Sequence, residues 1–224
     1  MASFKQWMGS LSRDRASHGY IIVAPNSVQV GMGTQQVKGI DFMLAANEDP
    51  NSKYFGKIDT DKIGAMGHSQ GGMGTVVASA DPRIKSVILW NGGTSAGKPF
   101  LAVSGDADIG STTAAMDNAV QAAAMPAAWL WYHQIPTSVN GSTTGPLAPG
   151  HLTLMMESER VQDVAVAWWD HILKNKPEAA TFLRCPGGML CDGTAYPSMW
   201  AQSAGVVAGS TLDSSIEYGH NGML

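Results

Sequence analysis

Short apolar runs alternate along the chain with longer segments in which apolar residues recur at helical spacing. Each short run is rich in β-branched or aromatic residues and stops near a turn residue, a pattern typical of buried strands. Strands are predicted at residues 20–24, 62–66, 86–90, 100–104 and 128–134. Helices are predicted at residues 3–17, 35–47, 71–80, 112–124 and 157–174. This alternation predicts an α/β fold, with a mostly parallel sheet and helices on both faces. An irregular Gly- and Ser-rich C-terminal stretch follows.

The composition fits one globular domain over residues 1–224. Hydrophobic residues make up 44% of the chain and charged residues 14%, and no internal repeat is visible. The formal net charge is −4 without a run of lysine and arginine, so a nucleic-acid partner is not expected. No apolar stretch reaches the roughly 20 residues of a membrane-spanning helix, and the N-terminus lacks the apolar core of a signal peptide. We therefore expect no membrane partner, and the oligomeric state stays open.

A nucleophile motif follows the second predicted strand. Residues 67–71 read Gly-His-Ser-Gln-Gly, with a further glycine at position 72, between an apolar strand and a small-residue helix. This G-x-S-x-G pattern places a serine on a sharp, strained turn, where larger neighbours would clash with backbone. The helix that starts at Gln70 points its free N–H groups toward the same place, where they stabilise a developing oxyanion. Ser69 is the predicted nucleophile, and the alternative is an ordinary Gly-rich loop.

An acid and a base must activate that serine, and in this fold they follow later strands in the order Ser, Asp or Glu, His. Asp106 and Asp108 come directly after the fourth predicted strand. Asp108 is our choice and Asp106 the reserve, and the alternative for both is an ordinary turn residue. His151 is the preferred base because it lies in a loop between a strand and the long helix, and His133 is second. The imidazole would accept the Ser69 proton while Asp108 orients the ring.

Two cysteines, Cys185 and Cys191, flank a Pro-Gly-Gly segment. They could close a disulfide loop in an oxidising compartment, or stay as free thiols in a cytosolic protein, and their spacing leaves both open. A metal site is less favoured because no second pair of Cys or His completes four ligands. Serine ester chemistry needs no cofactor, so none is expected.

Several motifs together resemble a known family. The segments ASHGYIIVAPN, KIGAMGHSQGGMGT, RIKSVILWN and LAVSGDADI are similar to bacterial cutinase-type polyester hydrolases, which include poly(ethylene terephthalate) hydrolases. The segment VAVAWWDHILKNKPEAATFLRC resembles the stretch before their C-terminal cysteine, so the resemblance covers most of residues 16–192. It implies an α/β-hydrolase fold with catalytic Ser69, Asp108 and His151, an oxyanion donor in the Gln70 backbone N–H, and a Cys185–Cys191 disulfide.

The resemblance also implies a function. We expect cleavage of polyester or cutin-like esters at an open, shallow site, in a secreted or periplasmic protein. A general small-ester carboxylesterase is the alternative among enzymes, and a non-catalytic α/β-hydrolase-like binding protein is the alternative outside them. Trp90 lies near the position of the family's aromatic substrate contact but out of register, and a core role at the end of a strand is favoured for it.

The chain departs from the family pattern at two places near the nucleophile. Gln70 stands where these hydrolases usually carry Met. Family members have several strands before the segment that matches ASHG, and a loop there supplies their second oxyanion N–H. Residues 1–19 contain no Gly-rich equivalent, and the loop at 26–34 is the nearest substitute. Since loss of one oxyanion donor costs ~10²–10³ in turnover, we expect a weak enzyme.

Overall fold

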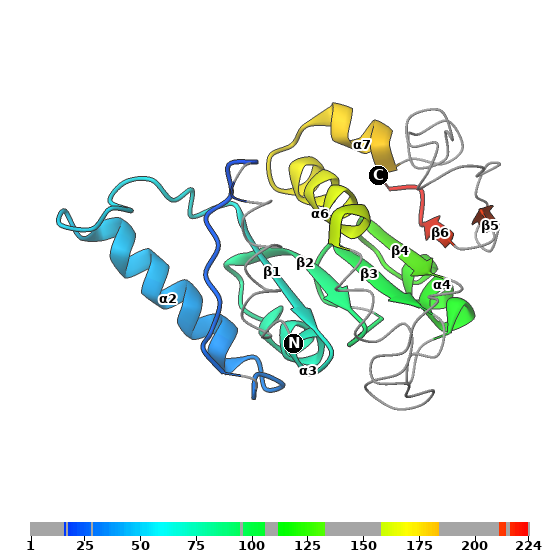
Figure 1. The fold of residues 1–224 in the computed structure, drawn as a ribbon, viewed down its shortest axis with the longest axis horizontal. Coiled ribbons are helices and arrows are strands. Elements are labelled where there is room, and N and C mark those ends of the chain that lie inside the picture. The colour runs from blue at the N-terminus through cyan, green and yellow to red at the C-terminus, as the bar shows by residue number, and fades with distance from the viewer. Residues whose placement is uncertain are drawn as a thin grey trace.

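A six-stranded sheet forms the centre of the computed structural model (Figure 1). The structure describes residues 16, 18–27, 29–94, 96–105, 112–132, 158–183, 211–213 and 216–223. The strands are β1 Ile63–His68, β2 Ile84–Trp90, β3 Phe100–Gly105, β4 Ala127–Tyr132, β5 Thr211–Asp213 and β6 Ile216–His220. Their order is β1-β2-β3-β4-β6-β5, in which β1 to β4 are parallel and β6 is antiparallel to both β4 and β5. The mostly parallel sheet is confirmed.

Helices cover both faces of this sheet, as expected for parallel strands that are buried on each side (Figure 1). The helices are α2 Thr34–Glu48, α3 Gln70–Ala78, α4 Thr113–Gln121, α6 Ser158–Ile172 and α7 Pro177–Leu183. On the α3 and α4 face, Leu89, Phe100 and Trp129 pack into one buried cluster with Met116 of α4. On the opposite face, the buried Trp168 of α6 donates its indole N–H to Ser86 Oγ at 2.8 Å.

The predicted elements between residues 35 and 174 agree with the structure, apart from shifts at their ends. The helix predicted at 3–17 falls mostly outside the described residues. Among the described residues, no helix is both long enough and apolar enough to cross a lipid bilayer.

The strand predicted at residues 20–24 is wrong. The segment forms no ladder with any described strand, and Ile21 and Val23 are 42% and 43% exposed. Apolar β-branched residues favour a strand only where a neighbouring strand offers backbone partners. This segment has no such neighbour in the described structure, so it runs as irregular chain.

The irregular C-terminus that we predicted is wrong for residues 211–213 and 216–220, which form β5 and β6. Just after β6, the Asn221 side chain donates to the carbonyls of Ala123 and Met125 at 3.2 and 2.8 Å. The Ala127 N–H donates to Asn221 Oδ1 at 3.3 Å, and the Asn221 N–H donates to the Ala127 carbonyl at 3.2 Å. These bonds fix the register of β6 against β4.

Candidate active site

Ser69 occupies a strained turn between β1 and α3. Its backbone angles are φ 56° and ψ −121°, and it is one of three described residues other than glycine with positive φ. Side chains seldom adopt such a conformation, and it persists where the surroundings hold it. Here the Ser69 N–H donates to the Trp90 carbonyl at 2.8 Å, and the Ser69 carbonyl accepts from the Met73 N–H at 3.1 Å. The turn is therefore held by β2 on one side and by α3 on the other.

Glycines make this turn possible through close backbone contact. A Cβ at Gly67 would lie 2.1 Å from the Gly71 carbonyl oxygen, and one at Gly72 would lie 2.8 Å from the Gly92 carbonyl oxygen. A Cβ at Gly92 would lie 2.0 Å from the Ser69 carbonyl oxygen. Gly92 belongs to the turn after β2, so the chain after β2 packs directly against the nucleophile turn.

The first turn of α3 supplies free backbone donors beside Ser69. Because the first bond into the helix runs from Met73 to Ser69, the N–H groups of Gln70 and the next two residues have no partner within the helix. The helix dipole adds positive potential at this end. These groups can stabilise an oxyanion that forms on a carbonyl attached to Ser69, and the Gln70 N–H comes first in the chain.

The loop at 26–34 lies against this same helix turn. A Cβ at Gly31 would lie 2.9 Å from Cγ of Gln70, and a Cβ at Gly74 would lie 1.9 Å from the Val30 carbonyl oxygen. The Gln36 side-chain amide donates to the carbonyls of Val30 and Gly71 at 3.5 and 3.4 Å. The loop therefore lies close enough to line the nucleophile site.

Trp90 ends β2 and is 1% exposed. This burial places the Trp90 side chain in the protein core. The next residue, Asn91, has φ 47° and donates its N–H to the Val103 carbonyl at 2.9 Å. Trp90 thus supports the nucleophile turn through its backbone, and its indole ring belongs to the core.

The carboxyl ends of the four parallel strands lie at the same end of the sheet. His68 pairs with Trp90, Trp90 with Val103, and Val103 with Leu130 in the registers of β1 to β4. β3 thus ends two strand spacings from β1, roughly 10 Å away. The end of β3 and Ser69 therefore lie at the same end of the sheet.

The described histidines other than His68 lie away from Ser69. His220 pairs with the start of β4, and His171 lies in the last turn of α6, which packs against the start of β1. The His18 carbonyl accepts a hydrogen bond from Lys174, just beyond α6. His68 adjoins Ser69 at the end of β1. The other predicted site residues lie outside the described residues, namely Asp106, Asp108, His133, His151, Cys185 and Cys191.

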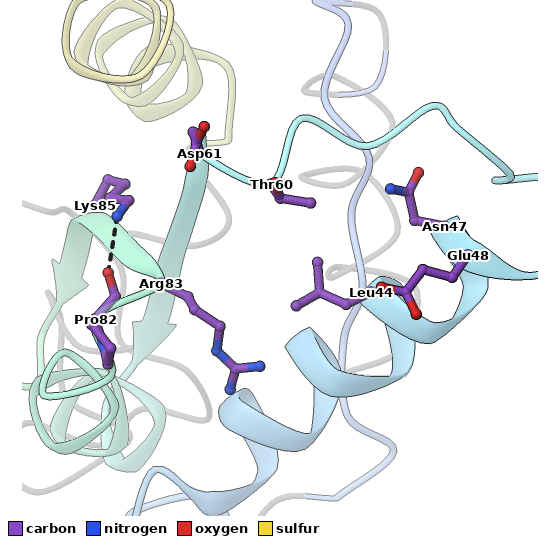
Figure 2. Close-up of a pocket in the computed structure, with 8 residues that line it drawn as sticks. All are labelled: Leu44, Asn47, Glu48, Thr60, Asp61, Pro82, Arg83 and Lys85. Carbon is purple, nitrogen blue, oxygen red and sulfur yellow. Dashed lines mark hydrogen bonds between the residues drawn. The ribbon is translucent and has the colours of Figure 1, made fainter.

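A polar cavity of about 420 Å³ opens at the opposite end of the strands, where β1 and β2 begin. Figure 2 shows the residues that line it. They are Leu44, Asn47, Glu48, Thr60, Asp61, Pro82, Arg83 and Lys85. The Arg83 guanidinium bonds Asp81 and Asp41 at 2.6 and 2.7 Å, which lowers the pKa of Asp81. This cavity lies at the opposite end of β1 from Ser69. No group of three His, Cys, Asp or Glu side chains within the described ranges could hold a metal ion.

Comparison with known proteins agrees with this geometry. The family model described as "PETase: PET hydrolase-like" matches residues 1–190. Cutinase 2 of Thermobifida cellulosilytica is 25% identical over 81% of this chain and 67% of its own length. Cutinase cut1 of Thermobifida fusca is 25% identical over 81% of this chain and 55% of its own length. Cutinase est1 of Thermobifida alba is 26% identical over 86% of this chain and 64% of its own length. The chain thus spans between about half and two thirds of these relatives. The chain belongs to the PET hydrolase-like family, and its sheet is that of an α/β hydrolase.

Proposed function

We propose that this protein is a serine ester hydrolase that works through an acyl-enzyme, with Ser69 as the nucleophile. The observation that carries the proposal is the strained Ser69 turn between β1 and α3, with free helix N–H groups beside it. Backbone strain held in place by close glycine contacts is typical of functional sites. The names of the relatives, which are cutinases, and of the family support the same chemistry.

The proposed reaction has two halves. Ser69 Oγ attacks the ester carbonyl carbon while His151 accepts the Ser69 proton, and Asp108 orients and stabilises the imidazolium. The Gln70 N–H stabilises the oxyanion of the tetrahedral intermediate. His151 then gives its proton to the leaving alcohol as the ester C–O bond breaks. Water repeats the sequence on the acyl-enzyme, releases the carboxylic acid and returns the proton to Ser69.

The strand order supports the assignment of the acid and the base. Asp108 follows β3 by three residues, and β3 ends two strands from Ser69 at the same edge. His151 follows β4 and precedes α6. Since His18, His171 and His220 lie away from Ser69, three candidates for the base remain. They are His68, the neighbour of Ser69 in the chain, and the two histidines after β4, of which we propose His151.

The proposed substrates are polyesters or cutin-like esters. The family description and the relatives' names support this class. A matched assay compares release of p-nitrophenol from p-nitrophenyl butyrate with release of soluble products from a polyester film. Hydrolysis of the film at rates that rise with film area supports the proposal. Hydrolysis of soluble esters alone favours a general carboxylesterase.

The proposed location is outside the cytoplasm, with Cys185 and Cys191 joined as a disulfide. Support comes from the resemblance to secreted polyester hydrolases and from the short loop between the two cysteines. The mass of a thiol-alkylated sample, taken before and after reduction, tests the bond. Alkylation of both cysteines without reduction would refute it.

The first test compares Ser69→Ala with a matched control, Ser52→Ala, in the loop after α2. We expect Ser69→Ala to abolish butyrate hydrolysis and labelling by a serine-directed phosphonate, while Ser52→Ala retains both. Folding of each variant is checked by circular dichroism. Full activity in folded Ser69→Ala would refute the assignment, and a folded wild type that neither turns over nor labels would favour a non-catalytic protein.

A second set of variants separates the candidate acids and bases. We expect Asp108→Asn and His151→Ala each to lower kcat by at least about 10³-fold, as loss of a triad member does. Asp106→Asn and His133→Ala are the matched controls, with less than a tenfold effect. A reversed pattern within either pair would move the role to the other residue.

A further inference from the structure

The side-chain amide of Gln36 connects three segments that meet beside Ser69. Gln36 lies in the first turn of α2, and its Nε2 donates to the Val30 carbonyl at 3.5 Å and to the Gly71 carbonyl at 3.4 Å. Val30 begins the turn that precedes α2, and Gly71 lies two residues after Ser69 in α3. Figure 1 shows the start of α2 beside α3. One amide therefore holds the turn before α2 against the nucleophile helix.

The position of this amide depends on close backbone contact. A Cβ at Gly74 would lie 2.9 Å from Gln36 Nε2 and 1.9 Å from the Val30 carbonyl oxygen. A side chain at position 74 would therefore displace both the amide and the turn. The Gly71 carbonyl also accepts the hydroxyl of the buried Thr75 at 2.9 Å. Two side chains from different helices thus donate to one carbonyl in the first turn of α3.

The hydrogen bonds of Gln36 matter more than the space that its side chain fills. Its Oε1 atom is buried and has no hydrogen-bond partner among the described residues. A buried acceptor without a partner destabilises the fold. An apolar side chain of similar size, such as methionine, would fill the same space without an unpaired acceptor. The two bonds that Nε2 donates are therefore the feature that an amide supplies at this position and an apolar residue does not.

The turn that Gln36 holds lies against the proposed oxyanion donor. Gly31 follows Val30, and a Cβ at Gly31 would lie 2.9 Å from Gln70 Cγ and 3.7 Å from the Gln70 carbonyl oxygen. Gln70 carries the backbone N–H that stabilises the oxyanion in the proposed reaction. A shift of the turn would move the wall beside this donor, and release of the Gly71 carbonyl would loosen the helix turn that contains it.

We propose that Gln36 is a positioning residue for ester hydrolysis at Ser69, an inference that rests on the proposed function. Its two donated bonds fix the turn at residues 30–33 against α3, and they fix the Gln70 N–H relative to Ser69 Oγ. An oxyanion donor acts mainly in the transition state, and a displacement of ~1 Å at a reacting centre costs ~10² in rate. Loss of the two bonds is therefore expected to lower kcat and to leave KM nearly unchanged.

The main variant is Gln36→Glu, because an ionised carboxylate has the shape of the amide and no donor for the two carbonyls. Gln35→Glu is the matched control, with the same change of charge in the same helix turn and no side-chain hydrogen bond to the described residues. At pH 8, kcat for p-nitrophenyl butyrate and the rate of phosphonate labelling are expected to fall at least about tenfold in Gln36→Glu, with KM within about twofold of wild type. Gln35→Glu is expected to retain both rates.

A pH series separates the donated bonds from packing. A protonated carboxyl can donate one hydrogen bond, and two facing carbonyl oxygens favour its protonated form. The described segments that pack on Gln36, residues 26–34 and 70–78, contain no ionisable side chain. The ratio of kcat in Gln36→Glu to that of wild type is therefore expected to rise as the pH falls from 8 to 5.5. The same ratio for Gln35→Glu is expected to stay constant.

A third variant, Gln36→Met, fills the space without a donor, and it decides the question if Gln36→Glu does not fold. It is expected to show the same loss of kcat at every pH. Wild-type kcat in folded Gln36→Met or Gln36→Glu would overturn the proposal, and so would an equal loss in Gln35→Glu. A rise in KM at constant kcat would overturn it by assigning Gln36 to substrate binding. If wild type itself neither turns over nor labels, the proposed function fails together with this inference.

Discussion

Replacement of Gly67 by alanine tests whether the nucleophile turn is held by close packing. The added Cβ would lie 2.1 Å from the Gly71 carbonyl oxygen and 2.2 Å from its carbonyl carbon. That oxygen is about 1.3 Å nearer than the 3.4 Å at which ordinary contact begins. The colliding atoms belong to the backbone of α3, so no side-chain rotation relieves the contact.

The expected cost follows from this geometry. Overpacking in a well-packed site costs about 1–3 kcal/mol. A clash between the added Cβ and main-chain atoms belongs at the upper end, because main-chain atoms cannot rotate away. About 3 kcal/mol changes the unfolding equilibrium more than a hundredfold. Displacement of Ser69 by even ~1 Å lowers turnover about a further hundredfold in the proposed reaction.

The matched control is Gly71→Ala, at the second glycine of the same motif. Among the described residues outside its own helix, a Cβ there would meet only Val30 Cγ2, at an ordinary 3.5 Å. Because alanine is also the better helix former, we expect Gly71→Ala to change stability by less than about 1 kcal/mol. Urea unfolding and butyrate hydrolysis measure both variants. If Gly67→Ala proves as stable and active as wild type, or Gly71→Ala as damaged as Gly67→Ala, the packing argument fails.

Three further predictions concern the supports of the fold. Burial raises the pKa of Asp170, but hydrogen bonds from two lysines and a tyrosine outweigh it and lower that pKa to about 2. Asp170→Asn should therefore cost ~2 kcal/mol at pH 7. This stabilisation is present above the unfolded pKa of about 4 and is lost as the pH falls toward 2. Urea unfolding should therefore show a smaller difference in unfolding free energy between wild type and Asp170→Asn at pH 2.5 than at pH 7. An equal difference at both pH values would contradict the prediction. Ser86→Ala should cost ~1–3 kcal/mol by leaving the buried Trp168 N–H unpaired, and equal thermal midpoints would rule this out. Asn221→Ala removes the hydrogen bond to the Met125 carbonyl, so backbone hydrogen exchange should become faster in residues 216–220 than in β4. Unchanged exchange in residues 216–220 would show that β6 keeps its register without this side chain.

The nucleophile turn could be predicted from sequence because its signals are local. The strand, the serine and the flanking glycines lie within a dozen residues, and each constrains backbone geometry on its own. The parallel strands were predictable for a related reason. A strand buried on both faces is a continuous apolar run, as in residues 86–90 and 100–104.

The two errors arose where structure depends on distant partners. Residues 20–24 have the composition of a buried strand but no strand beside them in the described sheet. Residues 216–220 lie in a polar, Gly-containing stretch, yet they pair with β4, and Asn221 anchors them through carbonyls near residue 125. Whether a segment finds a neighbouring strand depends on residues far away in the chain, so the hydrophobic pattern of residues 20–24 or 216–220 alone does not reveal it.

The first of these errors bears on the active site. The composition of residues 20–24 is typical of a buried strand, and in the structure these residues lie across an apolar groove from β1. β1 positions Ser69, and the Ser69 turn is fixed from the β2 side by the Trp90 carbonyl and from α3 by close glycine contacts. The nucleophile is thus held by its interior neighbours, and in the described sheet the strand that leads to it pairs with β2 alone. The geometry of the turn is therefore set from the β2 and α3 sides of β1.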